Sequence, residues 1–258
     1  MNKDEIISRI EKNPYYIKLI KNPTEDMAIL AIKSNGMLLK YIKNPSEKIA
    51  WEALKNNVWC IEYIPNPTEQ MCLFAVKKAW NTLKFIKKPS KPVIYEAIAN
   101  KGWAIQYVQN PSVEIQKLAV EKDFDSIKYI ENPNEEIQFV AVKKDWSAIK
   151  YIKEPTLKVE RLCIMQNEET MKYLNNITIE KIQLFILDNV NIVKYLDKDD
   201  IINIEPILIE KIKNNNVEDK YVIDFIRCSS FEFDKVKFIY KYGSMKAKRI
   251  LLDYKLSI

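Results

Sequence analysis

Glycine and histidine are the residues that this sequence has least of. Three glycines and no histidine occur among its 258 residues. Sandwiches, barrels and nucleotide-binding folds use glycine in tight turns and phosphate loops, so this low count argues against all of them. The absence of histidine removes the usual general base near neutral pH, the commonest metal ligand and the middle member of the Ser-His-Asp triad.

Motifs of catalysis and metal binding are missing as well. No Gly-x-Gly-x-x-Gly, Walker, Gly-x-Ser-x-Gly or His-Glu-x-x-His motif occurs. The four cysteines show no Cys-x-x-Cys spacing, and we interpret Cys72 and Cys163 as reduced thiols in the core. Neighbouring positions on a helix point apart, so Glu135 and Glu136 are not expected to act as an acid–base pair. We expect no enzymatic activity, no cofactor and no bound metal, and we interpret Asp199-Asp200 as a solvated junction between repeats.

Long apolar runs are also absent. No stretch approaches the ~18 apolar residues of a membrane span. The first ten residues, MNKDEIISRI, carry acidic residues and lack the apolar region of a signal peptide. We therefore expect a cytoplasmic protein without a membrane partner. The net charge of +6 is mild for a dedicated nucleic-acid binder.

Proline marks an internal repeat of 22 residues, and a repeat of this kind determines the fold. Serial prolines stand at positions 23, 45, 67, 89, 111, 133 and 155. Eight residues after each proline comes a small residue: Ala31, Ala53, Ala75, Ala97, Ala119, Ala141 and Cys163. An aromatic residue follows each proline after eighteen residues, and Tyr195 keeps this spacing in an eighth unit although Ile177 replaces the proline.

Each unit predicts two short helices. In Asn22-Pro23-Thr24-Glu25 we expect Asn to cap the first helix, Pro to occupy its first turn and Glu to reach back as in a capping box, with Thr as the alternative cap. A polar break such as Asn56-Asn57 precedes a shorter second helix, and one helix of the pair can take the 3₁₀ form. Helices this short need neighbours to stack on.

The sequence therefore predicts an all-α fold, an α-solenoid of eight 22-residue two-helix repeats. We expect a divergent N-terminal cap over residues 1–22, the solenoid over residues 23–198 and a helical C-terminal cap over residues 199–258. A separate functional module is the alternative for the last segment. That module would carry Lys235, Lys237, Lys241, Lys246, Lys248 and Arg249.

This pattern resembles the short two-helix repeat families, namely HEAT-like arrays and especially the leucine-rich-repeat-variant type with its Asn-Pro-Ser/Thr helix starts. The resemblance covers about residues 23–198, although the unit is shorter here than in most of those families. It implies an interaction scaffold, with nucleic-acid binding as the exception among relatives.

Aligned lysines and aromatic residues form the candidate partner-binding site, which we name the Lys/aromatic stripe. Its lysines follow the proline position after seventeen residues, and its aromatic residues each precede one of them by four. The members are Lys40, Lys84, Lys128, Lys150, Lys172 and Lys194 with Trp80, Phe124 and Trp146. Because repeats stack, these side chains are expected to line one face and to attract an anionic partner. The alternatives are solvated lysines that cover apolar surface, and ring packing between repeats with a lysine over the ring.

These features favour a non-enzymatic protein-binding scaffold that presents the Lys/aromatic stripe to an acidic protein. The abundance of Lys, Ile and Asn is typical of an AT-rich source such as a low-GC bacterium or its phage. A stoichiometric inhibitor encoded by a phage would fit this design. The alternative is a nucleic-acid-binding solenoid, because single strands bind where bases stack on rings and lysines meet phosphates. No small-molecule substrate is inferred.

Overall fold

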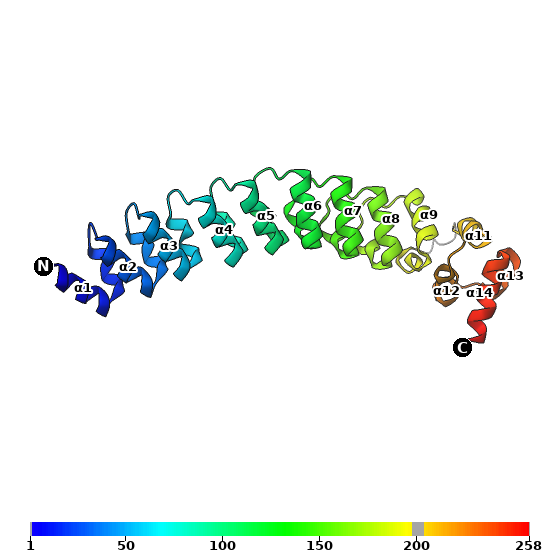
Figure 1. The fold of residues 1–258 in the computed structure, drawn as a ribbon. Helices are drawn as coiled ribbons and strands as arrows, with labels where there is room; N and C mark the ends of the chain where they lie inside the picture. The colour runs from blue at the N-terminus through cyan, green and yellow to red at the C-terminus, as the bar shows by residue number, and fades with distance from the viewer. Residues whose placement is uncertain (1, 198–203, 258) are drawn as a thin grey trace. The chain divides into compact units, whose positions relative to one another are not determined.

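The computed structural model describes residues 2–197 and 204–257, and within these ranges every regular element is a helix. The fold is an α-solenoid, as the sequence predicts: α-helices of 10 residues alternate with 3₁₀ helices of 6, labelled η, and successive pairs start 22 residues apart (Figure 1). Contacts between the helices divide the chain into two compact units, Met1–Asn132 and Pro133–Ile258.

The first unit contains α1 (Lys3–Lys12), η1 (Pro14–Leu19), α2 (Glu25–Ser34), η2 (Gly36–Tyr41), α3 (Glu47–Asn56), η3 (Val58–Tyr63), α4 (Glu69–Lys78), η4 (Trp80–Phe85), α5 (Lys91–Asn100), η5 (Gly102–Tyr107), α6 (Val113–Lys122) and η6 (Phe124–Tyr129). The N-terminal segment, expected as a divergent cap, thus contains the same α–3₁₀ pair as the repeats that follow it.

The second unit contains α7 (Glu135–Lys144), η7 (Trp146–Tyr151), α8 (Leu157–Gln166), η8 (Glu168–Tyr173), α9 (Ile179–Asp188), η9 (Val190–Tyr195), α11 (Glu205–Lys213), α12 (Asp219–Arg227), α13 (Lys235–Tyr242) and α14 (Met245–Leu256). The predicted boundary after residue 198 and the Asp199-Asp200 pair lie outside the described residues. The domain limits stay a prediction.

The α-helices start two residues later than an Asn cap predicts, at the place that the alternative Thr cap gives. The Thr24 hydroxyl, not Asn22, caps α2 by accepting a hydrogen bond from Met27 N–H, and most later repeats use Ser, Thr or Asn at the same place. The expected roles of Pro23 and Glu25 are therefore wrong. Pro23 precedes the cap, and Glu25 is the first helical residue, two positions too early for a capping box.

Asparagine instead makes the turns between helices. Asn44, Asn110 and Asn176 precede the proline position and adopt positive φ angles of 48°, 47° and 52°. Asparagine tolerates this left-handed conformation better than most residues, which accounts for its presence at these three positions. A second asparagine position caps the 3₁₀ helices, as where the Asn57 side chain accepts a hydrogen bond from Trp59 N–H.

Buried alanine lets successive helices approach closely. The alanine eight residues after the serial proline is fully buried in all six repeats that have it, and Cys163 and Phe185 take its place in α8 and α9. A large aliphatic or sulfur-containing residue near the middle of each η helix is buried as well, such as Leu39 or Ile61. Each repeat thus gives its neighbour an apolar surface, as the predicted stacking requires.

An aromatic cluster joins α12, α13 and the segment between them. Phe225 of α12 packs against Phe231, Phe233 and Phe238 with ring centroids 5.4–6.2 Å apart. The buried Tyr221 hydroxyl donates a hydrogen bond of 2.9 Å to the Ile186 carbonyl oxygen, which joins α12 to α9.

Overpacking should be costly at the alanine position and harmless nearby on the same helix. Ala97 of α5 is fully buried, whereas Ala99, two residues later, is exposed. We expect Ala97→Leu to lower the free energy of unfolding by about 1–3 kcal/mol, because the added carbons have no space. Ala99→Leu should change it little. Urea unfolding followed by circular dichroism measures both, and equal effects of the two substitutions would contradict close packing at the buried alanine.

Candidate functional site

All nine residues of the Lys/aromatic stripe lie on 3₁₀ helices. The lysines are the fifth residue of η2, η4, η6, η7, η8 and η9, and Trp80, Phe124 and Trp146 are the first residue of η4, η6 and η7. A 3₁₀ helix has three residues per turn, so residues i and i+3 lie on the same side. In ideal 3₁₀ geometry each lysine is therefore aligned with the second residue of its own helix, three positions earlier, and not with the first.

Aromatic rings of the η helices pair across neighbouring repeats. Each pair joins a ring near the start of one η helix to the ring that ends the next η helix. The pairs are Trp59–Phe85, Trp80–Tyr107, Trp103–Tyr129 and Trp146–Tyr173, with centroids 6.2–6.4 Å apart. Ring pairs in such edge-on or offset geometry add about 0.5–1.5 kcal/mol beyond the area they bury. The terminal tyrosines are thus half-buried or exposed partners of these rings, and not core residues.

Three lysines of the stripe lie over these ring pairs. The ammonium of Lys84 is 5.4 and 4.7 Å from the ring centroids of Trp59 and Phe85, that of Lys128 is 3.8 and 5.1 Å from Trp103 and Tyr129, and that of Lys150 is 5.4 and 4.8 Å from Trp146 and Tyr173. Of the pairs four residues apart, Trp146 and Lys150 meet. Lys84 instead lies over Trp59 of the preceding repeat, while Trp80 pairs with Tyr107 of the next one.

Three of the six lysines of the Lys/aromatic stripe form ion pairs with carboxylates. They are Lys128, Lys172 and Lys194. Lys128 Nζ lies 3.0 Å from an Asp125 oxygen, at the i,i+3 spacing that the 3₁₀ helix aligns. Burial raises the pKa of Asp125, but hydrogen bonds from the Trp103 indole and Lys128 outweigh it and leave the pKa below its usual value. Asp125 thus stays charged near neutral pH and fixes Lys128 over Trp103. Lys172 is paired at the same i,i+3 spacing on η8, and Lys194 of η9 is paired with a carboxylate of the preceding η helix.

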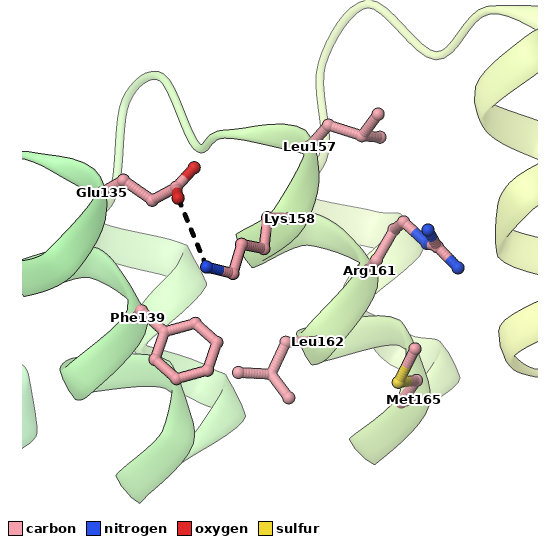
Figure 2. Close-up of a pocket in the computed structure, with 7 residues that line it drawn as sticks. All are labelled: Glu135, Phe139, Leu157, Lys158, Arg161, Leu162 and Met165. Atoms are coloured by element: carbon pink, nitrogen blue, oxygen red, sulfur yellow. Dashed lines mark ion pairs between the residues drawn. The ribbon is translucent and has the colours of Figure 1, made fainter.

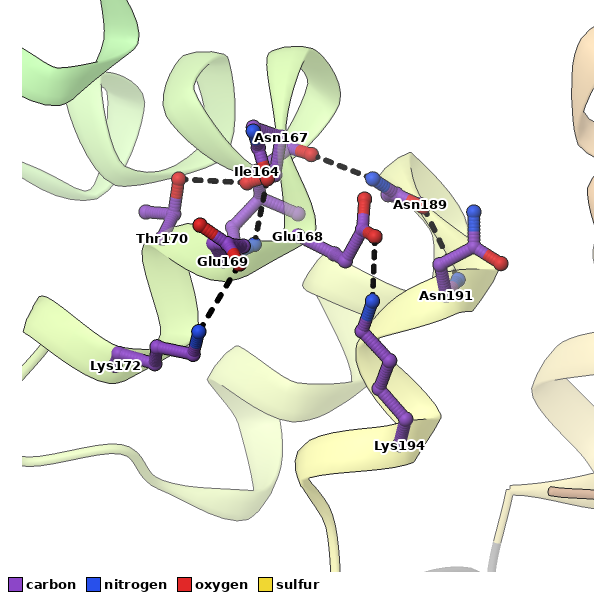
Figure 3. A network of polar contacts seen from close by, with 9 residues as sticks. All are labelled: Ile164, Asn167, Glu168, Glu169, Thr170, Lys172, Asn189, Asn191 and Lys194. Carbon is purple, nitrogen blue, oxygen red and sulfur yellow. Dashed lines mark hydrogen bonds and ion pairs between the residues drawn. The ribbon is translucent and has the colours of Figure 1, made fainter.

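Figure 3 shows how the paired lysines of η8 and η9 are held. Lys172 Nζ lies 3.0 Å from Glu169 of its own helix, and Lys194 Nζ lies 2.6 Å from Glu168 of the preceding one. Burial is the largest influence on the pKa of Glu168 and raises it, but the hydrogen bond from Lys194 and smaller effects together lower it below its usual value. The side chain of Asn189 donates to the Ile164 carbonyl oxygen at 2.9 Å and so ties η9 to the end of α8.

The six lysines of the Lys/aromatic stripe therefore fall into two classes, unpaired and paired. Lys40, Lys84 and Lys150 are exposed, and within the described residues no carboxylate lies within ion-pair distance of them. Lys128, Lys172 and Lys194 are neutralised by acidic residues at the first or second position of an η helix. These acids are not part of the predicted stripe, although Asp125 and Glu169 precede their lysines by the three residues that a 3₁₀ helix aligns.

The α-helices present a different surface. A groove of about 560 Å³ lies between α7 and α8, and its apolar lining includes Phe139, Leu162 and Met165 (Figure 2). Its charged rim is paired within the protein: Lys158 lies 3.5 Å from Glu135, and Arg161 donates two hydrogen bonds of 2.7 and 2.8 Å to Asp188. The groove can take an apolar group, but the residues described along it offer no unpaired acid, base or nucleophile.

Chemistry at the cysteines is suppressed by burial. All four cysteines are reduced and buried, as expected for Cys72 and Cys163. Burial raises the pKa of the Cys60 and Cys163 thiols to about 12, so almost no thiolate exists near neutral pH. Among the described residues no group of three or more Cys, Asp or Glu side chains is placed to hold a metal ion.

Comparison with protein-family models, curated proteins and solved structures gives no match to this chain. The described helices also include none with the length and apolar character that a bilayer crossing requires.

The buried thiols predict slow chemical modification. In the native protein at pH 8 we expect Cys60 and Cys163 to react with Ellman's reagent far more slowly than a free thiol, because the reactive species is the thiolate. In guanidinium chloride, where the pKa returns to about 8.5, both should react at once. Mass spectrometry after partial labelling identifies the sites, and rapid native labelling of either cysteine would contradict the burial.

Proposed function

We propose that this protein is a non-enzymatic scaffold that binds an acidic protein partner through the Lys/aromatic stripe. The observation that carries the proposal is that its rings and lysines already cover one another. A base needs an open ring face to stack on, and here the rings pair with each other and lie beneath lysines. This arrangement supports a protein partner over a nucleic acid.

The unpaired cations determine the kind of protein. Lys40, Lys84 and Lys150 can accept carboxylates, since within the described residues they have none nearby. Lys84 and Lys150 rest on ring pairs, so their side chains are already ordered and lose less conformational entropy on binding. Lysine also attracts an acidic surface at long range and raises the association rate.

The lysines that are paired with acids also favour a protein partner over a nucleic acid. A phosphate track gains affinity from each cation that releases counterions. Asp125, Glu168 and Glu169 place negative charge inside the row and would repel a phosphate backbone there. A protein surface with mixed charges can match this alternation, whereas a uniformly anionic strand cannot.

We also propose that the chain is related to HEAT-like or leucine-rich-repeat-variant arrays, on the basis of its Asn-Pro-Ser/Thr helix starts. Such arrays hold partners on long surfaces with little rearrangement. A stoichiometric inhibitor, which acts by occupying an acidic surface of another protein, would use the scaffold in this way. Nucleic-acid binding by the same stripe is the alternative.

Reversing the three unpaired cations should abolish partner capture. We expect Lys40→Glu, Lys84→Glu, Lys150→Glu to lose a protein that the wild type retains from the source lysate. The matched control reverses three exposed lysines elsewhere, Lys78→Glu, Lys213→Glu and Lys255→Glu, and should keep it. Quantitative mass spectrometry of the captured proteins compares the three samples, and equal loss in both variants would contradict a specific surface.

Fluorescence anisotropy with labelled single-stranded RNA, single-stranded DNA and duplex DNA tests the alternative. We expect no submicromolar binding at physiological salt. Submicromolar binding that weakens steeply with salt, and that the stripe variant but not the control abolishes, would replace our proposal with the nucleic-acid function. Removing each lysine that touches a phosphate should then lower the log–log salt slope by about one.

A further inference from the structure

The α-helices of the first unit carry three rows of side chains on a face separate from the Lys/aromatic stripe. The first, fifth and ninth residues of a helix lie along one side at four-residue spacing. On α2, α3 and α4 these positions read acid, apolar and lysine in every case. The rows are Glu25, Glu47 and Glu69; Ile29, Trp51 and Leu73; and Lys33, Lys55 and Lys77.

These rows have the composition of an interface. All six charged residues are exposed, and the apolar row between them is half-buried. Leu30 and Phe74 widen the apolar row, and Trp51 packs edge-on against Phe74 with centroids 5.7 Å apart. An apolar centre with a charged rim is the usual anatomy of a protein–protein contact.

The rows are mostly free of internal pairing. Glu25 pairs with Lys48 at 2.7 Å and Lys55 pairs with Glu52 at 2.9 Å. Glu47, Glu69, Lys33 and Lys77 have no ion-pair partner among the described residues. Four of six rim charges can therefore pair with charges on another molecule.

A two-fold axis parallel to the rows makes this surface complementary to itself. Rotation about such an axis places each helix antiparallel to the same helix of a second copy. The acidic row then faces the lysine row, and the apolar row faces itself, so that Glu47 meets Lys55 of the second copy and Trp51 meets its own equivalent. A two-fold axis across the rows would place acid on acid, and only the first arrangement pairs the charges.

Helix α1 extends this self-complementary pattern with the charges reversed. Its corresponding residues are Lys3, Ile7 and Glu11. Under the same rotation Lys3 would face Glu11 of the second copy. The pattern ends at α5, where Lys91, Tyr95 and Ala99 occupy these positions. Self-complementarity is the requirement for an isologous dimer, in which residue i contacts j and j contacts i.

We propose that the face of α2, α3 and α4 is an interface between two copies of this chain, related by a two-fold axis along the row of Ile29, Trp51 and Leu73. Each α-helix is about 15 Å long. At the usual helix spacing, three helices offer a footprint on the order of 400 Å² per copy. The total of about 800 Å² lies below the ~1,200–2,000 Å² of standard specific interfaces, so we expect a weak, reversible dimer. The inference does not depend on the function proposed for the Lys/aromatic stripe.

Two complementary variants test the interface. The lysine-faced variant carries Glu25→Lys, Glu47→Lys and Glu69→Lys, and the acid-faced variant carries Lys33→Glu, Lys55→Glu and Lys77→Glu. Sedimentation velocity over a concentration series measures the mass of the wild type, of each variant and of their equimolar mixture. We expect the wild type to rise from 30.5 kDa toward twice that mass. Each variant alone should stay monomeric, since like charges then face each other, and the mixture should form a heterodimer.

The mixture distinguishes a disrupted interface from a misfolded variant, because only folded surfaces regain partners. A further variant controls for the change in net charge. Three Lys→Glu changes take +6 to 0, and three Glu→Lys changes take it to +12. The variant with Lys40→Glu, Lys84→Glu and Lys150→Glu also has charge 0, and mixed with the lysine-faced variant it should not reproduce the heterodimer.

Three results would overturn the proposal. The first is a wild type that remains monomeric to high micromolar concentration. The second is a dimer that persists in both single variants, which would place the interface elsewhere. The third is a mixture of two folded variants that associates less than tenfold more tightly than either alone, since charge pairing across the rows would then contribute nothing.

Discussion

Stacking of one repeat on the next is the interaction on which everything else in this protein depends. An α-helix of 10 residues or a 3₁₀ helix of 6 has too few internal hydrogen bonds to persist in water. In six repeats a fully buried alanine lets the following helix approach closely enough to bury its apolar side, and Cys163 and Phe185 take that place in α8 and α9. Order in each helix is therefore supplied by its neighbours, without a large globular core.

Repetition turns single residues into rows. A residue type that recurs every 22 positions appears at the same place on each helix, so lysine near the end of the 3₁₀ helix gives a row of cations and Glu at the α-helix start gives a row of acids. The two faces use their charges differently. On the 3₁₀ face, acids such as Asp125 and Glu168 neutralise part of the cation row from within. On the α face of the first unit, acids and lysines stand about 12 Å apart across an apolar row and are mostly left unpaired.

The candidate surface was predictable in outline but not in its contacts. The lysine row follows from the repeat alone, because a fixed period places equivalent side chains on one face. Its ring contacts do not follow from spacing along the chain: Trp146 and Lys150 meet, whereas Lys84, which also follows its tryptophan by four residues, lies over Trp59 of the preceding repeat. A six-residue segment is too short for its apolar spacing to distinguish the α-helical from the 3₁₀ period. The neutralising role of Asp125 was hidden for the same reason.

What the sequence by itself determined is the all-α class, the 22-residue unit, the buried alanine position and the polar break between the two helices. These features are local or strictly periodic, and apolar spacing with helix-breaking residues is enough to define them. Only the tertiary structure decided that the second helix is 3₁₀, that Thr24 and not Asn22 caps the first, and which rings lie beneath the lysines. The ring contacts depend on how neighbouring repeats pack and not on any residue's own preference, whereas the choice between Asn22 and Thr24 as the cap is local and depends on where the backbone becomes helical.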